Sequence, residues 1–263
     1  RGSLLLYTSQ VAVINNQQLN PYLCPMKKTG TLYLIPTVLA EGTQDQVISP
    51  QVKEAVQHLT YFIVENLRTA RRFVKSICPE LVIEQLQFVQ VDKDATPAQV
   101  QASLKPLLEK GIDAGIISEA GCPGIADPGA EVVKYAHQKS IKVVPFAGPS
   151  AILLSLMASG FNGQQFCFHG YLPIEKRDRL QALRQLEKEM QQRNQTQIFM
   201  ETPYRNNKLL EDLLTTLHPE TRLCIAANIT SPEHEFIQTK TIQQWKGKLP
   251  DIHKQPAVFL IYR

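Results

Sequence analysis

Short runs of apolar and β-branched residues alternate with longer amphipathic segments along the chain from Thr31 onward. The apolar runs predict strands at residues 32–35, 61–64, 86–91, 114–117 and 142–146. The segments between them predict helices at residues 50–59, 67–77, 97–110 and 129–140. Strands that alternate with helices are typical of a parallel sheet with helices packed on both faces. The first half of the chain is therefore predicted to be a doubly wound α/β domain.

The second half of the chain has a more mixed pattern. A helix is predicted to begin after Gly148 and Pro149, and further helices are predicted at residues 177–192 and 204–217. Strands are predicted at residues 166–169, 198–201, 223–227, 235–239 and 257–262, with a hairpin near the end of the chain. Because no long linker separates the halves, we expect two α/β domains, residues 26–147 and 148–263, joined by a packed hinge near Ala147.

The first 25 residues differ from the pattern that follows them. Arg1, Gly2 and Ser3 look like a cloning remnant, and Met26 followed by two lysines is typical of a natural start. We therefore interpret residues 1–25 as a foreign segment or an upstream leader. A secretory signal would need a longer apolar region and a small-residue cleavage site.

A glycine-rich segment, residues 118–129, follows the predicted strand 114–117 and precedes a predicted helix. Five of the nine residues 121–129 are glycine or proline. Glycine tolerates positive φ and lets backbone N–H groups approach a ligand, and open α/β sheets bind ligands at the carboxyl ends of their strands. The segment is predicted to bind a ligand, and an ordinary strand-to-helix turn is the alternative.

Composition narrows the class of protein without identifying a ligand. Of the 263 residues, 43% are apolar and 20% are charged, as in ordinary globular proteins. No apolar run approaches the ~18 residues of a membrane span. The five cysteines are widely spaced without a C-x-x-C pair, which argues against a zinc site or a disulfide framework and favours reduced thiols in a cytosol. The net charge of +4 is too small to indicate a nucleic-acid partner by itself.

Common catalytic signatures are missing from the sequence. The six histidines have no metal-ligand spacing, and no G-x-S-x-G motif of a hydrolase occurs. No G-x-G-x-x-G motif follows the first predicted strand. Its absence argues against a Rossmann dinucleotide site and against the ordinary Rossmann-type methyltransferase loop.

Five motifs occur in a specific order: TLYLIPT (31–37), ENLR (65–68), SEAGCP (118–123) with DPG (127–129), VVPFAGPSA (143–151) and FCFHGYLP (166–173). In this order they resemble the tetrapyrrole methylase superfamily, and most closely its branch of ribosomal RNA small subunit methyltransferases. The resemblance covers about residues 31–262. It implies two α/β domains with the active-site cleft between them and S-adenosylmethionine as cofactor. It also implies a cytoplasmic homodimer that methylates ribosomal RNA at the ribose 2′-hydroxyl of a cytidine.

The resemblance implies a set of cofactor contacts from both domains. They are Pro36, Thr37, Ser118, Glu119, Ala120, Gly121, Ile125, Ser150, Ala151, Met200, Ala226 and Ala257. Some have structural alternatives, because Ser150 is suited to cap its helix and Met200 and Ala226 are suited to a core. The cofactor carries the reactive methyl group and the protein mainly positions two partners, so no catalytic triad is expected.

Three charged residues are candidates for a catalytic role: Glu119, Glu65 and Arg68. A carboxylate at a strand end, as at Glu119, is suited to bind the ribose or the methionine amine, or to orient the acceptor hydroxyl. Glu65 and Arg68 occupy two positions of the E-D-T-R motif of the RNA-methylating branch. They are interpreted as an acceptor-binding pair, or alternatively as a salt bridge that caps the helix after them.

Two clusters of basic residues stand out. The first is Arg68, Arg71, Arg72 and Lys75, and the second is Lys176, Arg177, Arg179 and Arg184. We expect the first cluster to spread over more than one face of its helix. Each cluster is interpreted as a phosphate contact or as a solvated surface.

Departures from the RNA-methylating branch bear on the acceptor. Residues 38–42 replace its P-I-G-N-L loop, residues 254–258 replace a K-G-E-M-V-like segment, and residues 226–231 replace A-R-E-L-T-K. Basic residues are therefore missing at Ala227 and Ser231, and RNA affinity depends on Lys and Arg. Two alternatives stay open: a carbon methyltransferase of a porphyrin or corrin precursor, and a non-catalytic module that binds the cofactor.

Overall fold

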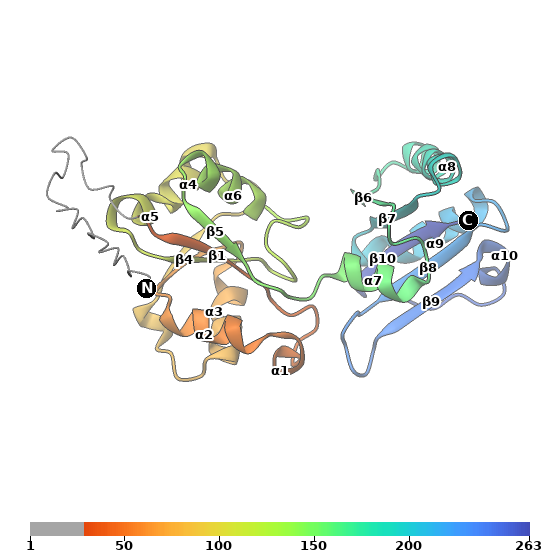
Figure 1. The fold of residues 1–263 in the computed structure, drawn as a ribbon. Coiled ribbons are helices and arrows are strands. Elements are labelled where there is room, and N and C mark those ends of the chain that lie inside the picture. Colours follow the sequence, from red (N-terminus) through yellow and green to blue (C-terminus); the bar gives the residue numbers. More distant parts are fainter. Residues whose placement is uncertain (1–28) are drawn as a thin grey trace, which may run out of the picture.

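The structure is a computed structural model, and it describes residues 29–263. The predicted leader, residues 1–25, and Cys24 lie outside this part of the chain. Two five-stranded sheets organise the fold (Figure 1). Each sheet is built from one continuous stretch of chain, residues 31–145 and residues 166–262. The predicted α/β fold with two sheets is confirmed, and the proposed boundary at Ala147 falls between them.

The first sheet is parallel throughout and has the strand order β3-β2-β4-β1-β5. Its strands are β1 (Thr31–Ile35), β2 (Tyr61–Val64), β3 (Gln87–Gln90), β4 (Ala114–Ile117) and β5 (Lys142–Pro145). All residues of β2 and β4 are buried, because helices cover both faces of the sheet. Ile117 pairs with Ile35 on one side and Val64 on the other, so three strands end at the same edge.

Two hydrophobic clusters pack on the two faces of this sheet. One joins Ile35 and Phe62 to α2 (Pro50–His58) and α3 (Leu67–Ile77). The other joins Leu32 and Ile63 to α4 (Pro97–Ser103), α5 (Lys105–Lys110) and α6 (Gly129–Gln138). The two sets of helices lie on opposite sides of the strands in Figure 1. Short turns of helix, α1 (Gln44–Val47) and η1 (Ile83–Gln85), complete this half.

The predicted helix at residues 97–110 is wrong in one respect, because it is two helices. α4 ends at Ser103, and α5 begins at Lys105 with Pro106 in its first turn. A proline inside a continuous helix has no N–H to donate and clashes with the preceding turn, whereas it is favourable at a helix start. Pro106 therefore explains the break at Leu104.

The second sheet has the order β6-β7-β10-β8-β9. Its strands are β6 (Phe166–Tyr171), β7 (Thr196–Met200), β8 (Arg222–Ala227), β9 (Phe236–Thr241) and β10 (Ala257–Tyr262). β6 and β7 are parallel, and the other pairs are antiparallel. The predicted hairpin near the end of the chain is formed by β8 and β9, while β10 inserts between β7 and β8. The sheet is mixed, as the pattern predicted.

Helices cover both faces of the second sheet as well. α8 (Lys176–Arg193), α9 (Asn206–Thr216) and α10 (Ile242–Trp245) pack on the face that carries Phe199 and Phe259. α7 (Ala151–Ser159) packs through Ile152 and Leu156 on the other face. A short turn, η2 (Pro203–Arg205), precedes α9. The observed helix therefore begins at Asn206, two residues later than the predicted start at residue 204. Within residues 29–263, no helix combines the length and apolar character needed to cross a membrane.

Candidate active site

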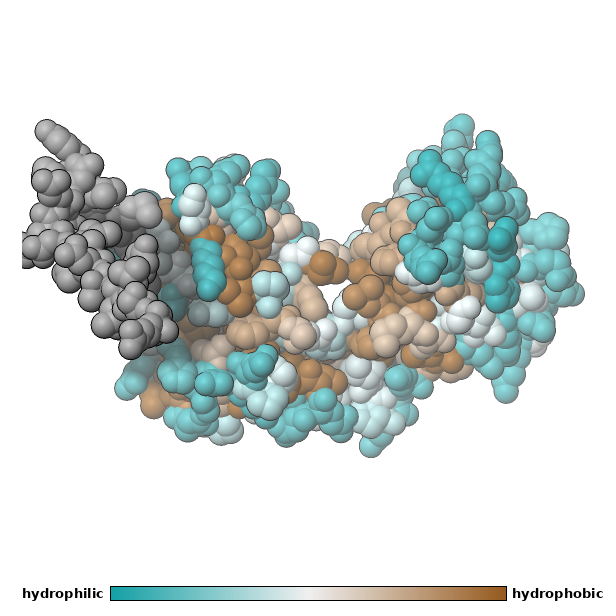
Figure 2. Space-filling view, in the orientation of Figure 1, coloured by the Kyte–Doolittle hydropathy of each residue, from teal (hydrophilic) through white to brown (hydrophobic). Residues whose placement is uncertain are grey.

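A cavity of about 350 Å³ lies between the two sheets, and residues from both halves of the chain line it. Figure 2 shows the molecule hollowed between its two halves, with apolar residues gathered on both sides of the hollow. Most residues that the sequence marked as cofactor contacts or catalytic candidates belong to this lining. They are Glu65, Ser118, Glu119, Ala120, Gly121, Ile125, Ser150, Ala151, Met200, Ala226 and Ala257.

The first wall of the cavity is the glycine-rich segment after β4. Gly121 and Gly124 have φ angles of +78° and +81°, which side-chain-bearing residues rarely adopt. A Cβ atom at Gly121 would lie 3.3 Å from both the Leu39 side chain and the Pro149 carbonyl oxygen. The conformation of this turn therefore requires glycine, and the turn is packed between the loop after β1 and the segment that leads to α7.

Pro36 and Thr37 are placed behind this turn, and neither belongs to the cavity lining. Both residues are buried. The Thr37 backbone N–H donates to the Gly121 carbonyl oxygen at 2.8 Å, and the Thr37 hydroxyl lies 3.5 Å from the carbonyl oxygens of Ser118 and Gly121. Thr37 therefore supports the turn that lines the cavity, whereas Pro36 lies against Gly148.

Asp127 holds the far end of the same turn, a role that the sequence analysis missed although it quoted the DPG motif. Its carboxylate Oδ1 accepts the backbone N–H of Gly124 at 2.5 Å and that of Gly129 at 2.9 Å. Burial raises the pKa of Asp127, and these two hydrogen bonds oppose the rise. Because one oxygen bridges both ends of residues 124–129, its loss would release the loop.

Two glutamates, Glu65 and Glu119, follow the ends of β2 and β4 and line the cavity. The Glu119 backbone N–H donates to Glu65 Oε2 at 3.3 Å. Burial raises the pKa of Glu65, and the negative charges of Glu119, Asp127 and Asp92 add to the rise. Glu65 Oε2 is thus occupied by a backbone donor, which leaves Oε1 available to a ligand. A carboxyl group with a raised pKa in a cavity is a candidate for proton transfer.

The second wall of the cavity consists of small and apolar side chains on the second sheet. Val258, in the central strand β10, pairs with Met200 on one side and Ala226 on the other. Tyr171, at the end of β6, pairs with Met200 from the opposite side. The register of four strands therefore brings these side chains to one end of the sheet, and Ala257 and Ile229 extend the surface.

Ser150 and Ala151 begin the helix that connects the two walls. The Ser150 hydroxyl accepts the Leu153 backbone N–H at 3.5 Å, so Ser150 caps α7. It also lines the cavity. Ser150 is therefore both a helix cap and a cavity residue, because the N-cap side chain lies at the open end of the helix.

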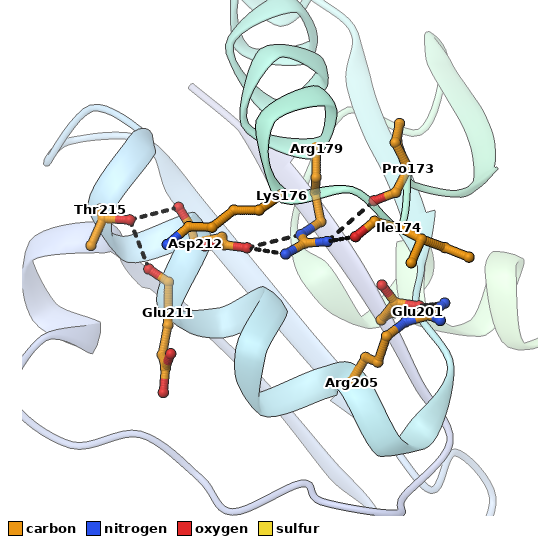
Figure 3. A network of polar contacts seen from close by, with 9 residues as sticks. All are labelled: Pro173, Ile174, Lys176, Arg179, Glu201, Arg205, Glu211, Asp212 and Thr215. Atoms are coloured by element: carbon orange, nitrogen blue, oxygen red, sulfur yellow. Dashed lines mark hydrogen bonds and ion pairs between the residues drawn. The ribbon is translucent and has the colours of Figure 1, made fainter.

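Glu201, directly after β7, is a cavity residue that the pattern of the sequence did not mark. It is 3% exposed and pairs with Arg205, whose Nη2 lies 2.6 Å from Glu201 Oε1. The same oxygen accepts the Thr202 backbone N–H at 2.6 Å. Figure 3 shows this pair, which fixes the turn η2, and Pro203 of that turn lines the cavity. Its only sequence signal was its position at the carboxyl end of a predicted strand.

The basic residues of α3 lie on one face of the helix, so the prediction that they spread over several faces is wrong. Arg68, Arg71, Arg72 and Lys75 are all exposed, opposite the buried residues Ala70, Phe73, Val74 and Ile77. Spacings of three, four and seven residues place side chains on one helical face.

Arg68 differs from its three neighbours on this face. Arg71 lies over the Phe88 ring, Arg72 pairs with Glu41 at 3.5 Å, and Lys75 donates to the Leu81 carbonyl oxygen at 3.0 Å. Within residues 29–263, the Arg68 guanidinium has no ion pair or hydrogen bond. Arg68 does not line the cavity, but it lies in the first turn of α3, three residues after Glu65.

The second basic cluster is not a uniform surface. Arg179 is 2% exposed, and its Nε and Nη2 donate to Asp212 Oδ2 at 2.8 and 2.6 Å. Its Nη1 donates to the carbonyl oxygens of Pro173 and Ile174, as Figure 3 shows. Arg179 therefore ties the segment after β6 to α9, and it is unavailable to a phosphate. Lys176, Arg177 and Arg184 remain outside the core.

The structure also shows the surroundings of Ala227 and Ser231, the two positions where basic residues are missing. Ala227 is fully buried in the core of the second half. Because position 227 is buried, having alanine there in place of a basic residue takes no positive charge from the protein surface. Ser231 lies in the loop between β8 and β9, where its backbone N–H donates to the Asn228 carbonyl oxygen.

The cavity suits the cofactor that the resemblance implies. Its volume lies within the range of small-molecule sites, which are mostly apolar with a few placed polar groups. Carboxylates at Glu65 and Glu119 match hydroxyl and ammonium donors, and the apolar second wall matches a planar base. Among residues 29–263, no group of three or more His, Cys, Asp or Glu side chains has the arrangement of a metal site.

The chain is similar to known proteins in sequence and in fold. The family profile for tetrapyrrole (corrin/porphyrin) methylases matches residues 45–244. A ribosomal RNA small subunit methyltransferase I from Buchnera aphidicola subsp. Schizaphis graminum is 29% identical over 239 residues, covering 90% of this chain and 79% of that protein.

Two solved structures resemble the fold. The methyltransferase CobJ has a TM-score of 0.59 at 18% identity, and the match covers 89% of this chain and 95% of that one. A uroporphyrin-III C-methyltransferase from Thermus thermophilus, solved with S-adenosylhomocysteine, has a TM-score of 0.50 at 16% identity and covers 89% and 98%. At these identities the likeness concerns the fold alone.

Proposed function

Because the chain belongs to the tetrapyrrole (corrin/porphyrin) methylase family, we propose that it methylates ribosomal RNA of the small subunit with S-adenosylmethionine as donor. The observation that carries this proposal is the cavity between the two sheets, where the glycine-rich turn faces an apolar wall. The relative from Buchnera, named for small-subunit ribosomal RNA, supports the acceptor class. Within that class, a cytidine ribose 2′-hydroxyl is the acceptor group that we propose.

In this proposal the first wall binds the polar part of the cofactor. Ser118, Glu119, Ala120 and Gly121 present backbone groups and one carboxylate to it, and the second wall holds the adenine. When bound, S-adenosylmethionine supplies a methyl group activated by a positive sulfur. The work of the protein is to position the acceptor in line with that methyl and to exclude water.

We assign the acceptor proton to Glu65. Its Oε2 is held by the Glu119 backbone N–H, so Oε1 is the atom that accepts the proton of the acceptor hydroxyl. Burial and neighbouring carboxylates raise the pKa of Glu65, which makes it a stronger base than an ordinary glutamate. This role requires the hydroxyl to approach from the side of β2, where α3 begins.

Arg68 is the residue of α3 that we propose to contact the RNA. Its guanidinium is exposed and has no partner within the described residues, whereas its neighbours on the helix face are engaged. Arginine binds phosphate with two parallel hydrogen bonds. Single-stranded RNA is the preferred form, because a duplex hides its base edges and a cavity admits only a splayed nucleotide.

The test measures methyl transfer from radiolabelled cofactor to small ribosomal subunits that lack the modification. We expect Arg68→Ala to reduce transfer at least tenfold while leaving the affinity for S-adenosylhomocysteine unchanged, because one charge-assisted contact is worth about 1.5–3 kcal/mol. Arg72→Ala is the matched control on the same helix face and is expected to retain most of the activity.

Each outcome of this experiment is informative. Labelled RNA with wild type and not with Arg68→Ala supports the proposal. Equal loss in both arginine variants would indicate general charge and not a specific contact. If wild type binds S-adenosylhomocysteine but labels no RNA, the RNA acceptor is wrong, and a porphyrin or corrin precursor becomes the acceptor to assay.

We also propose that the protein acts as a homodimer in the cytoplasm. Seven of the nine residues of α7 are apolar and its two serines are buried, yet Leu153 is 50% exposed and Met157 is 77% exposed. Helices of this kind are usually covered on all sides. A two-fold pair is the commonest arrangement of homo-oligomers, and the free cysteines Cys78, Cys122, Cys167 and Cys224 suit a reducing compartment. Light scattering of the full chain gives the mass that tests the dimer.

A further inference from the structure

The mouth of the cavity carries exposed aromatic side chains on the second half of the chain. Tyr171 lines the cavity and is 60% exposed, and Tyr204 is 72% exposed beside Pro203, which also lines it. The apolar face of an exposed tyrosine beside a cavity is suited to contact a ligand. The family motif at residues 166–173 includes Tyr171, but the proposed function assigns no role to it.

The Tyr204 ring is held in place by its surroundings. The Lys254 backbone N–H donates to the Pro203 carbonyl oxygen at 3.0 Å, and Asn206 Nδ2 donates to the Gln255 carbonyl oxygen at 2.7 Å. These bonds join the turn η2 to the loop before β10. Glu201 and Arg205 fix the same turn from the cavity side. The ring is therefore exposed on a rigid support.

A lysine and a histidine lie beside this ring. Lys254 Nζ lies 5.8 Å from the centroid of the Tyr204 ring, and the His253 ring meets it edge-on with 6.3 Å between centroids. An aromatic ring beside a cationic side chain is a combination that binds single-stranded nucleic acid, because a base stacks on the ring and a phosphate pairs with the cation.

We propose that Tyr171 and Tyr204 form a base-stacking surface for single-stranded RNA at the cavity mouth. Tyr171 contacts the acceptor nucleoside, since it belongs to the cavity lining, and Tyr204 stacks on a neighbouring base whose phosphate is paired with Lys254. This inference rests on the proposed RNA acceptor and names the residues that hold the strand. It places the bases on the second half of the chain, whereas Arg68 binds phosphate on the first.

The test is direct binding of a fluorescein-labelled single-stranded RNA of about ten nucleotides, a length suited to one such surface. Fluorescence anisotropy is measured at low salt with S-adenosylhomocysteine present. We expect Tyr204→Ala to weaken RNA binding roughly tenfold, because a base loses its stacking partner. Tyr204→Phe keeps the ring and is expected to bind like wild type, and Tyr171→Ala is expected to resemble Tyr204→Ala.

Phe166→Ala is the matched control, since Phe166 is a partly exposed aromatic at the opposite end of β6. Its RNA affinity is expected to equal that of wild type. Circular dichroism and the affinity for S-adenosylhomocysteine confirm that each variant is folded and keeps its cofactor site. A loss of cofactor affinity in Tyr204→Ala would overturn the inference, because the ring would then belong to the donor site.

Other results overturn it equally clearly. Unchanged RNA binding in Tyr204→Ala refutes the stacking surface, even where wild type methylates ribosomal subunits. Equal weakening in Tyr204→Ala and Tyr204→Phe would assign the effect to the hydroxyl and not to stacking. If wild type methylates no ribosomal RNA but Tyr204→Ala still weakens RNA binding, the stacking surface stands and the proposed acceptor fails. No RNA binding by wild type refutes both.

Discussion

The two walls of the cavity are built in different ways. The first wall is a loop whose shape depends on positive φ at Gly121 and Gly124 and on two hydrogen bonds to Asp127. The second wall is a sheet surface whose shape depends on strand register and on the volume of side chains such as Met200 and Ala226. A loop of this kind has few ways to accommodate an added group, whereas a sheet surface changes its volume gradually. The two walls should therefore respond differently to substitution.

The largest effect is expected on the first wall. Ala120→Leu adds three carbon atoms at an exposed position that lines the cavity, so it occupies the space of the ligand without straining the turn. We expect the affinity for S-adenosylhomocysteine, measured by calorimetry, to fall more than ~100-fold, because inserted side-chain volume cannot coexist with a bound ligand. Gly121 is a poorer target, since a substitution there would also strain its backbone.

Ala102→Leu, at an exposed position of α4 outside the cavity, is the matched control and should bind like wild type. Both variants should unfold at the same denaturant concentration as wild type. A folded Ala120→Leu protein with unchanged affinity would contradict the placement of the cofactor against the first wall.

A smaller effect is expected on the second wall. Met200→Ala removes apolar surface from the cavity without blocking it, so we expect the same affinity to fall about fivefold, which corresponds to about 1 kcal/mol of lost apolar contact. Leu249→Ala is the matched control, because it removes a similar side chain that is 38% exposed and does not line the cavity. A loss in Met200→Ala as large as that in Ala120→Leu would remove the distinction between the walls.

The smallest effect concerns the pH dependence of stability. Burial raises the pKa of Asp127, so the native state binds its proton more tightly than the unfolded chain. The free energy of unfolding of wild type therefore falls as the pH rises from about 4 through the raised pKa. Asp127→Asn keeps an oxygen that accepts both N–H groups but has no charge to bury.

Urea unfolding at several pH values measures this difference. We expect Asp127→Asn to gain stability relative to wild type as the pH rises from about 4 through the raised pKa, and to gain nothing further above it. A difference between the two proteins that stays constant over this range would show that the charge of Asp127 is not the cause.

The elements of the fold were predictable where local signals were strong. β4 and α3 have the predicted bounds, because β4 is a continuous apolar run and α3 begins at an N-cap, Asn66, whose side chain accepts two backbone N–H groups. Residues 97–110 were predicted as one helix because the apolar spacing continues across the break. In the folded protein, the effect of Pro106 outweighs this spacing and divides the segment into two helices.

The two walls were not equally predictable either. The first wall was predicted because glycines in a turn leave a local trace in the sequence. Val258 and Tyr171 were missed because they reach the cavity only through the pairing of β10 and β6 with β7. Arg179 looked like a surface residue, since its partner Asp212 lies 33 residues away. Contacts between distant strands and helices leave no such local pattern.

Because each sheet is one continuous stretch of chain, each wall is encoded largely by one continuous part of the gene. A single genetic crossover in the codons for residues 146–150 would join the donor-binding loop of one ancestor to the second sheet of another. The tyrosines proposed for the acceptor lie beyond that point, and the glycine-rich turn lies before it. Such a crossover would keep Glu65, Arg68 and the glycine-rich turn together and would exchange the whole second wall, which contributes to both the donor and the acceptor site.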